Sequence, residues 1–336
     1  MNADSDHRVA HRPTIGVVPG DPNGIGHEIL VKTWASGALH PHCRPLVVGD
    51  ADLVEHTVRL LGASLSVRRV ADIEHLPGDC GDDASTIDVL VSDAFPVAAM
   101  RLGQDTRDAG AVSGAWLDHA DRLAQRRILD GAVMGPISAK AMDMAGTLHA
   151  IPSHKPGQEA YLLLRSGPLV VAHLTDHVPL RDVSAAITQD AVLRLVTQLA
   201  RAMTQWGLGG GRIGVAGFNP HASGVEEQQH IAPAIERARA QGINVEGPVS
   251  PDSIFRQCIE GRYQAVIATY HDQGHIAIKT WGFSGNNVVF LGPPYAYTTV
   301  AHGVAYDLAG SGRADHSMLQ NAILNAASLA AGRGFH

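Results

Sequence analysis

Short apolar runs recur along the chain and alternate with longer stretches of mixed polarity. Eight of these runs span five to seven residues, and most are rich in Val, Ile and Leu. This pattern is typical of strands that are buried on both faces. It predicts strands at residues 14–18, 44–49, 87–91, 131–135, 169–174, 212–218, 265–270 and 287–292.

The stretches between the apolar runs favour helices. The clearest helical patterns lie at residues 109–127, 188–206, 230–240 and 315–331. Strands that alternate with helices indicate βαβ units and a mainly parallel sheet. A chain of 336 residues is also more consistent with two domains than with one. The sequence therefore predicts an α/β fold in which mainly parallel sheets are flanked by helices.

Charge and composition narrow the class of partner. The chain is 45% hydrophobic and 18% charged, its net charge is −7 and its pI is near 6.2. No segment carries a stripe of lysine and arginine of the kind that binds nucleic acid, so a nucleic-acid partner is not expected. A small-molecule substrate is the expected partner.

Cysteine usage and the first residues indicate the compartment. Cys43, Cys80 and Cys258 are widely separated and form no C-x-x-C pair, which fits buried thiols in a reducing environment. Residues 1–12 are polar and lack the apolar centre of a signal peptide. No run approaches the ~18 apolar residues of a membrane span, so no membrane association is expected. We expect a cytoplasmic protein.

Three histidines each follow a predicted strand: His177, His221 and His271. Open α/β sheets place their ligand crevice just beyond the carboxyl ends of their strands. Neutral imidazole is the commonest transition-metal ligand, and three protein ligands leave positions open for a substrate oxygen. A three-histidine metal site is one hypothesis. The three lie 44 and 50 residues apart, so no helical i, i+4 pair joins them, and loop histidines that only form hydrogen bonds are an equal alternative.

A glycine-rich turn, GDPNGIGHE, follows the first predicted strand at residues 20–28. The spacing of Gly20, Gly24 and Gly26 does not match G-x-G-x-x-G, and no G-x-x-x-x-G-K-[ST] motif occurs in the chain. A nucleotide cofactor would therefore have to be held in another way. Taken alone, the turn is more typical of a tight strand-to-helix corner than of a cofactor site.

Six motifs, taken in order and spacing, resemble the 4-hydroxythreonine-4-phosphate dehydrogenase family throughout the chain. They are GDPNGIGHE at 20–28, HVPLRD at 177–182, NPHA at 219–222, GPVSPDSIF at 247–255, YHDQGHIAIK at 270–279 and HGVAYDLAGSGRAD at 302–315. The resemblance implies the two-domain fold of the isocitrate and isopropylmalate dehydrogenases. It implies a first α/β domain at residues 1–136 plus 300–336 and a second at 137–299, a homodimer, and an active-site cleft between the domains at the subunit interface.

The resemblance also implies the cofactors, NAD and one divalent metal ion. The metal ligands it implies are the same three residues, His177, His221 and His271. The last motif is similar to the adenosine-binding loop of the wider superfamily. The cofactor-binding residues it implies are His302, Gly303, Asp307 and Gly310.

Two residues near His271 are the candidate catalytic residues. Lys279 is similar to the family's substrate-binding lysine, and Asp272 could either orient a metal ligand or act as a general base. In the chemistry that the resemblance implies, the metal lowers the pKa of the substrate hydroxyl while hydride passes to the nicotinamide. In substrates that carry a carboxylate β to the new ketone, loss of CO2 follows.

Several positions that bind the substrate in the family carry other residues in this chain. The family sequence G-H-T-E-F is replaced by Gly157, Gln158, Glu159, Ala160 and Tyr161. The family arginine that holds the substrate phosphate falls on Tyr297, and a family asparagine falls on Val288, next to Asn287. A family lysine falls on Ala139, one position before Lys140, and a family aspartate falls on Ala301. The candidate substrate-binding residues are Gln158, Glu159, Lys279, Asn287 and Tyr297.

These changes lead to a functional prediction. The chain is predicted to be an NAD- and metal-dependent dehydrogenase of a secondary alcohol whose substrate lacks the phosphate, such as a carboxylated cis-dihydrodiol of the kind oxidised by terephthalate dihydrodiol dehydrogenases. One alternative is a true 4-hydroxythreonine-4-phosphate or 4-phospho-sugar-acid dehydrogenase. Two alternatives of other classes are a phosphate acyltransferase and a ligand-binding homologue without catalysis. A titration with NAD would separate these from a dehydrogenase.

Overall fold

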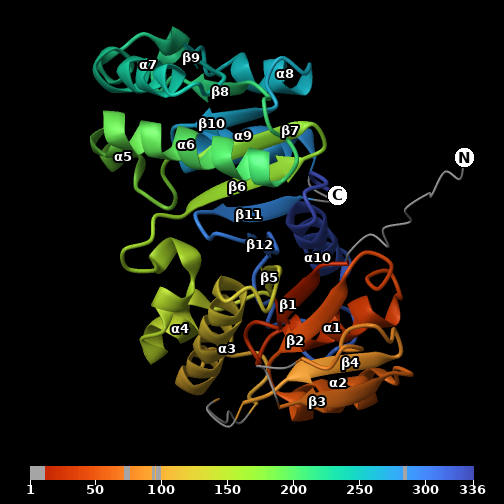
Figure 1. Ribbon diagram of the computed structural model, residues 1–336. Helices are drawn as coiled ribbons and strands as arrows, with labels where there is room; N and C mark the ends of the chain where they lie inside the picture. Colours follow the sequence, from red (N-terminus) through yellow and green to blue (C-terminus); the bar gives the residue numbers. More distant parts are fainter. Residues whose placement is uncertain (1–11, 72–75, 93–94, 96–99, 283–285) are drawn as a thin grey trace, which may run out of the picture.

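The computed structural model of the protein describes residues 12–71, 76–92, 95, 100–282 and 286–336 (Figure 1). Its strands form one sheet in the order β3-β4-β2-β1-β5-β12-β11-β6-β7-β10-β8-β9. The strands are β1 Thr14–Val18, β2 Arg44–Val48, β3 Ser66–Val70, β4 Thr86–Leu90, β5 Gly131–Met134, β6 Tyr161–Ser166, β7 Leu169–His173, β8 Ile213–Ala216, β9 Val245–Val249, β10 Ala265–Ala268, β11 Asn287–Leu291 and β12 Ala296–Thr299.

Helices cover both faces of this sheet (Figure 1). The α-helices are α1 Gly26–Ala35, α2 Ala51–Leu61, α3 Arg107–Gln125, α4 Ala139–Ala145, α5 Leu180–Ala186, α6 Gln189–Gln205, α7 Ala232–Ala240, α8 Ile254–Ile259, α9 His271–Trp281 and α10 Ser317–Ala330. All eight predicted strands are present, and so are all four predicted helices, with ends shifted by at most two residues. The prediction of an α/β fold with a mainly parallel sheet is confirmed.

Capping residues explain where several helices begin. The side chains of Asp50, Thr106, Ser138 and Thr188 each accept a hydrogen bond from a backbone N–H in the first turn of the helix that follows. Such caps satisfy donors that have no partner within the helix. These caps therefore set the first residue of α2, α3, α4 and α6.

The core lies on both faces of the sheet in each half of the molecule. In the first half, α1, α2 and α10 cover one face and α3 covers the other, where its Trp116 is 1% exposed. In the second half, α6 and α7 cover one face and α8 and α9 cover the other. Burial on both faces explains why most strands are apolar throughout rather than alternating.

The two halves of the sheet run in opposite directions. The pairs β12–β11, β11–β6 and β6–β7 are antiparallel, and the other neighbouring pairs are parallel. A twist of about 20–25° per strand turns the sheet by roughly 100–125° over the five steps from β5 to β10. The carboxyl ends of β5 and β7 therefore turn toward a common side, where Figure 1 shows α4 and α5.

The sheet is continuous where the domain boundary is expected. β12 pairs with β5 of the first half and with β11 of the second, so the polypeptide crosses from one half to the other within one sheet. The boundaries at residues 136 and 300 stay predictions. Among the described residues, no helix has both the length and the apolar character needed to cross a bilayer.

Candidate metal centre and cofactor loop

His177 and His271 meet at the carboxyl ends of two neighbouring strands. β7 and β10 are parallel partners, with Ala268 opposite His173. His177 lies four residues beyond β7, and His271, the first residue of α9, lies three residues beyond the end of β10. The two rings have centroids 4.8 Å apart. Asp176 joins them, because one potential ligand atom from each of the three residues lies within 4.8 Å of the other two.

The donor atoms of this group fit a divalent cation. Asp176 Oδ1 is buried and accepts no hydrogen bond. His177 Nδ1 approaches it to 2.8 Å, but without the geometry of a hydrogen bond. A buried carboxylate oxygen without a donor is costly, and a cation beside it would remove that cost. Carboxylate and imidazole together suit Zn²⁺, Mn²⁺ or Co²⁺.

Asp272 holds the ring of His271. Its Oδ1 lies 2.7 Å from His271 Nδ1, and this hydrogen bond lowers the pKa of Asp272 below its usual value. The carboxylate can only accept, so His271 carries its proton on Nδ1 and leaves the lone pair of Nε2 free. Carboxylates of this kind orient metal-binding histidines in many proteins. Of the two roles expected for Asp272, the contact favours orientation of a metal ligand.

His221 does not belong to the group formed by Asp176, His177 and His271. It follows β8 as expected, but it is exposed and adopts a φ of 56°, and Ala222 beside it has a φ of 53°. Two consecutive residues other than glycine in the left-handed region are strained, which is a common feature of ligand-binding loops. His221 lines a groove of about 710 Å³ on the outer side of α9, together with Asp272.

Two further histidines extend the row of rings beyond His271. His275 stacks on His271 with centroids 3.7 Å apart and an interplanar angle of 16°. The centroid of His173 lies 4.7 Å from that of His275. The sequence analysis did not predict a role for His173, His275 or Asp176. The i, i+4 spacing in HDQGH and the pair Asp176–His177 in TDH were the signals that could have indicated two of them.

The predicted substrate-binding residues are spread over several places. Glu159 is exposed and forms an ion pair with Arg194 of α6 at 2.5 Å. Gln158, next to it, is half-buried. Both precede β6, which is antiparallel to β7, so they lie at the same edge of the sheet as His177. Asn287 begins β11, which is parallel to β7, and so lies at the opposite edge.

Lys279 and Tyr297 are not beside the histidines. Lys279 is exposed in the last turn of α9, eight residues after His271, which is about 12 Å along a helix axis. Tyr297 is 2% exposed and packs edge-on against Phe290 inside the core of the first half. Burial raises the pKa of the Tyr297 hydroxyl. The roles of these residues in substrate binding stay predictions.

The cofactor loop, residues 302–315, folds against the glycine-rich turn. Glu28 is 3% exposed and its carboxylate accepts hydrogen bonds from the backbone N–H groups of Gly312 and Ala314. Lys32 donates to Glu28 and to the carbonyls of Gly312 and Ala314. The Ile25 N–H donates to Val304 O at 3.0 Å. A side chain at position 24 would collide with Val304, so this close approach requires Gly24.

The candidate cofactor residues lie along this loop. His302 and Gly310 are half-buried, whereas Gly303 and Asp307 are exposed. Tyr306, between them, donates a hydrogen bond either to Asp105 Oδ1 at 2.9 Å or to Asp21 Oδ2 at 3.2 Å. Burial raises the pKa of Asp21, while hydrogen bonding to Ser138 lowers the pKa of Asp105. The carboxylates of Asp21 and Asp105, on neighbouring segments, thus hold the Tyr306 hydroxyl of the loop in place.

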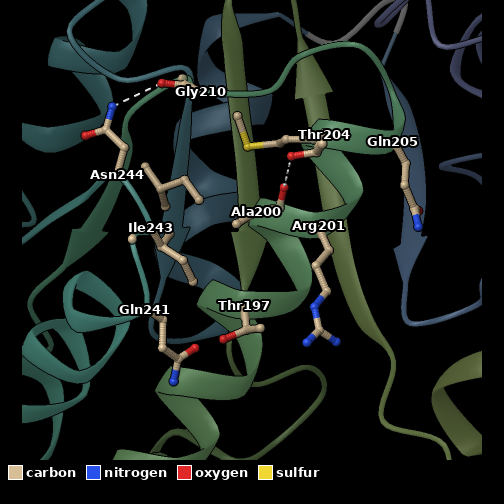
Figure 2. Close-up of a pocket in the computed structure, with 13 residues that line it drawn as sticks. Thr197, Ala200, Arg201, Thr204, Gln205, Gly210, Gln241, Ile243 and Asn244 are labelled. Atoms are coloured by element: carbon tan, nitrogen blue, oxygen red, sulfur yellow. Dashed lines mark hydrogen bonds between the residues drawn. The ribbon is translucent and has the colours of Figure 1, made fainter.

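A separate groove lies on the outer face of α6 (Figure 2). It has a volume of about 560 Å³ and is lined by Thr197, Ala200, Arg201, Met203, Thr204, Gln205, Gly210, Gly211, Ile213, Gln241, Gly242, Ile243 and Asn244. Arg201 is the one charged residue among these described lining residues. Because no acid, histidine or cysteine lines it, this groove offers no acid–base or metal chemistry.

Comparison with known proteins decides the family. The family model described as pyridoxal phosphate biosynthetic protein PdxA matches residues 41–326. The chain belongs to the PdxA family. The chain is 48% identical over 324 residues to a putative 4-hydroxythreonine-4-phosphate dehydrogenase of Novosphingobium aromaticivorans, covering 96% of this chain and 97% of the relative. It is 33% identical over 334 residues to a D-threonate 4-phosphate dehydrogenase of Cupriavidus necator, covering 96% and 98%.

Solved structures agree with this assignment. A 4-hydroxythreonine-4-phosphate dehydrogenase from Burkholderia phymatum superimposes with a TM-score of 0.82 at 30% identity, covering 95% of this chain and 98% of that chain. A terephthalate 1,2-cis-dihydrodiol dehydrogenase from Burkholderia xenovorans superimposes with a TM-score of 0.69 at 26% identity, covering 95% and 98%. The PdxA chain described here therefore has the isocitrate dehydrogenase-like fold and is a dehydrogenase acting on CH–OH groups. Its family suggests a nicotinamide cofactor and a divalent metal.

Proposed function

We propose that this PdxA-family protein is an NAD- and divalent-metal-dependent dehydrogenase that oxidises a secondary alcohol on an unphosphorylated diol or hydroxy acid. A carboxylated cis-dihydrodiol is the substrate class we favour. The observation that carries the metal-dependent part is the meeting of Asp176, His177 and His271, with Asp176 Oδ1 buried and without a donor. Zn²⁺, Mg²⁺, Mn²⁺ and Co²⁺ all remain candidates for the ion.

The residues have distinct tasks in the proposed reaction. A divalent ion bound here would act as a Lewis acid toward the substrate hydroxyl and so assist loss of its proton. The ion would be held by Asp176, His177 and His271. Asp272 would bind Nδ1 of His271 and so leave its Nε2 free to face the ion. Lys279 lies too far along α9 to touch the same oxygen as His271, so it would bind a distal carboxylate of the substrate rather than accept the proton.

NAD is the expected cofactor because the 302–315 loop offers little positive charge. Lys32, the lysine closest to the loop in the hydrogen-bond network, is held by Glu28 and two carbonyls and is not free to bind a 2′-phosphate. Arg313 is exposed and is the one arginine within the described residues 302–315, which contain no lysine. A catalytic efficiency higher with NADP than with NAD would overturn this choice.

The surroundings of Tyr297 support an unphosphorylated substrate. Where the family has a phosphate-binding arginine, Tyr297 is buried near the carboxylates of Asp118 and Asp121. Lys155 could replace the arginine, but it is paired with Asp121, which also accepts a hydrogen bond from Tyr295 at 2.5 Å. Lys140 is likewise paired, with Asp105 at 3.1 Å. These acidic neighbours disfavour a dianionic phosphate.

The same site is proposed to lie between two copies of the chain. Val178, Leu180, Val225 and Ile276 are apolar residues with 39–66% of their surface exposed, and all four lie close in sequence to His177, His221 or His271. Exposed apolar residues that lie together are typical of an interface, and we propose that these four form one. A homodimer that covers them could also bring His221 to the metal centre. We further propose a cytoplasmic location, consistent with three buried free thiols.

The alternative substrate is a 4-phosphorylated hydroxy acid, as in the names of the two relatives above. Steady-state kinetics with 4-phosphohydroxythreonine and with a panel of unphosphorylated diols separates the two. Loss of about two charge-assisted hydrogen bonds would lower the efficiency on the phosphorylated compound by roughly a hundredfold or more. An efficiency of ~10⁴ M⁻¹s⁻¹ or above on that compound would reject the unphosphorylated substrate class.

A further inference from the structure

The segment that carries His221 has a strained backbone and is held by a buried carboxylate. His221 and Ala222 have φ angles of 56° and 53°, a conformation that costs energy in residues other than glycine. Glu227, which is 2% exposed, lies a few residues further along the chain. Its Oε1 accepts hydrogen bonds from the backbone N–H groups of Phe218 and Asn219, both at 2.7 Å. Its Oε2 accepts a third hydrogen bond, from Asn219 Nδ2 at 2.8 Å.

Two glycines allow the segment to fold around this carboxylate. A side chain at position 217 would come within 2.6 Å of Ala222 Cβ. One at position 224 would come within 2.1 Å of Asn219 Nδ2 and 2.7 Å of Glu227 Oε2. Both approaches are too close for any residue with a side chain, so the contact between the segment and Glu227 requires glycine at both positions.

Glu227 is unusual in two respects. It begins a π-helical turn, Glu227–Ile231, and turns of this kind are frequent at functional sites. Its hydrogen-bond donors among the described residues are backbone and amide N–H groups rather than a lysine or arginine. Glutamates are rarely buried to this extent without a cation. Both features point to a role in function as well as in stability.

The same segment is tied to the helix that carries His271. Gln273, two residues later on α9, donates from Nε2 to Gly217 O at 2.9 Å. His221 lines the groove on the outer side of α9 together with Asp272. The position of the His221 imidazole beside α9 therefore depends on how this segment is held.

We propose that Glu227 is a positioning residue, which holds residues 217–222 so that the His221 imidazole faces the candidate metal centre of the homodimer. Glu227 touches neither the ion nor the substrate and acts only through His221. This inference rests on the proposed function, in which a second copy of the chain brings His221 to that centre. Without the Glu227 carboxylate, the left-handed backbone would relax and move the imidazole away from this position.

The first test measures the Co²⁺ affinity of the metal-free protein by competition with a chelator. We would compare the wild type with Glu227→Ala, His221→Ala and the double variant, and use Glu236→Ala, at an exposed glutamate of α7, as the matched control. Glu227→Ala should weaken binding by about 10–100-fold, the usual cost of losing a residue that orients a metal-binding histidine. Because Glu227 acts through His221, the double variant should bind no more weakly than His221→Ala. Additive losses, or unchanged affinity in Glu227→Ala, would overturn the proposal.

Two conservative variants separate positioning from folding. The amide oxygen of Glu227→Gln can still accept from the N–H groups of Phe218 and Asn219, so this variant should recover most of the affinity lost in Glu227→Ala. Amide hydrogen exchange of the metal-free proteins should be faster at these two N–H groups in Glu227→Ala than in the wild type, and equal rates would contradict the proposal. Thermal unfolding shows which variants are folded. Glu227→Asp, which keeps the charge but shortens its reach, replaces Glu227→Ala in the comparison if that variant does not fold.

His271→Ala distinguishes failure of this inference from failure of the proposed function. If His271→Ala binds Co²⁺ as well as the wild type does, the proposed metal centre fails, and this inference fails with it. If His271→Ala loses the ion while His221→Ala and Glu227→Ala keep it, the metal centre stands and the positioning role of Glu227 is wrong.

Discussion

In the first half of the molecule, the polar side chains under the cofactor loop are satisfied by the protein itself, whereas in the second half several polar atoms beside His271 are not. Both oxygens of Glu28 accept hydrogen bonds, and the side chain of Asn23 bonds to three different residues. By contrast, Asp176 Oδ1 and His173 Nε2 are buried and have no hydrogen-bond partner among the described residues. We infer that the first region keeps its shape without a ligand and that the proposed metal ion would complete the second.

The largest expected effect comes from the incomplete region. Replacement of His271 by Ala should reduce NAD turnover to background, because the proposed ion would lose a central ligand. NAD binding, measured by calorimetry, should be unchanged, because the cofactor loop lies in the other half. His56→Ala serves as the control. Full activity after exhaustive chelation would contradict the assigned role of this region.

Glu28 tests the satisfied region. Replacement by Ala leaves Lys32 and two backbone N–H groups without their buried acceptor. The free energy of unfolding, measured in urea, should therefore fall by about 3–5 kcal/mol. Glu28→Gln keeps one acceptor oxygen and should lose less. NAD affinity should fall in both variants while Co²⁺ affinity stays the same. A Glu28 variant that loses Co²⁺ binding but keeps NAD binding would contradict the assignment of Glu28 to the cofactor region.

His27 is one of the buried side chains of the first half whose polar atoms have no hydrogen-bond partner in the described part of the chain. It is fully buried against Trp116 with both ring nitrogens unpartnered, and burial lowers its pKa to about 4. Its folded-state pKa is below the unfolded value of 6.5, so the unfolded state binds more protons, and stability is lost as the pH falls from 6.5 toward 4. The loss attributable to His27 between pH 7 and 5 is about 2 kcal/mol.

Unfolding curves of the wild type and His27→Leu at these two pH values check this. The variant should lack that part of the pH dependence while retaining metal and NAD binding. Equal pH dependence in the two proteins would show that His27 finds a partner that the structure does not give it.

The smallest effect is expected at Tyr306. Replacement by Phe removes one hydroxyl that bonds to Asp105 or Asp21, and the net value of such a bond is about 1 kcal/mol. The affinity for NAD should fall by about fivefold. Tyr270→Phe, in the second half beside β10, is the control and should leave NAD affinity unchanged. A drop in metal affinity for Tyr306→Phe would couple the two regions and weaken the contrast.

The apolar strands could be predicted from the sequence because they are buried on both faces. The four that were missed have physical reasons. β3, SVRRV, and β9, VEGPV, are the two edge strands of the sheet, where arginines, glycine and proline are tolerated and the apolar pattern is lost. β6 and β12 lie at the centre, in or beside the antiparallel pairs that join the halves. β6 reads YLLLRS and ends in Arg and Ser, and β12 reads AYTT, so neither is an unbroken run of Val, Ile and Leu.

The candidate site was predicted in part. The strand-end positions of His177 and His271 followed from the apolar runs before them, and the two do meet. The place of Asp176 depends on the turn after β7, and that of His173 depends on the absence of a side chain at Gly274, neither of which a strand pattern reveals. His221 is not part of that group, and its left-handed backbone could not be predicted from the sequence NPHA.

The metal content of the purified protein tests the central claim most directly. After removal of loosely bound ions, elemental mass spectrometry of the wild type and of folded His271→Ala should be compared. The wild type should contain close to one divalent ion per chain, as a catalytic centre requires, and the variant should contain almost none. A folded, active wild type without stoichiometric metal, or a variant that retains it, would contradict the assignment of Asp176, His177 and His271 to a metal centre.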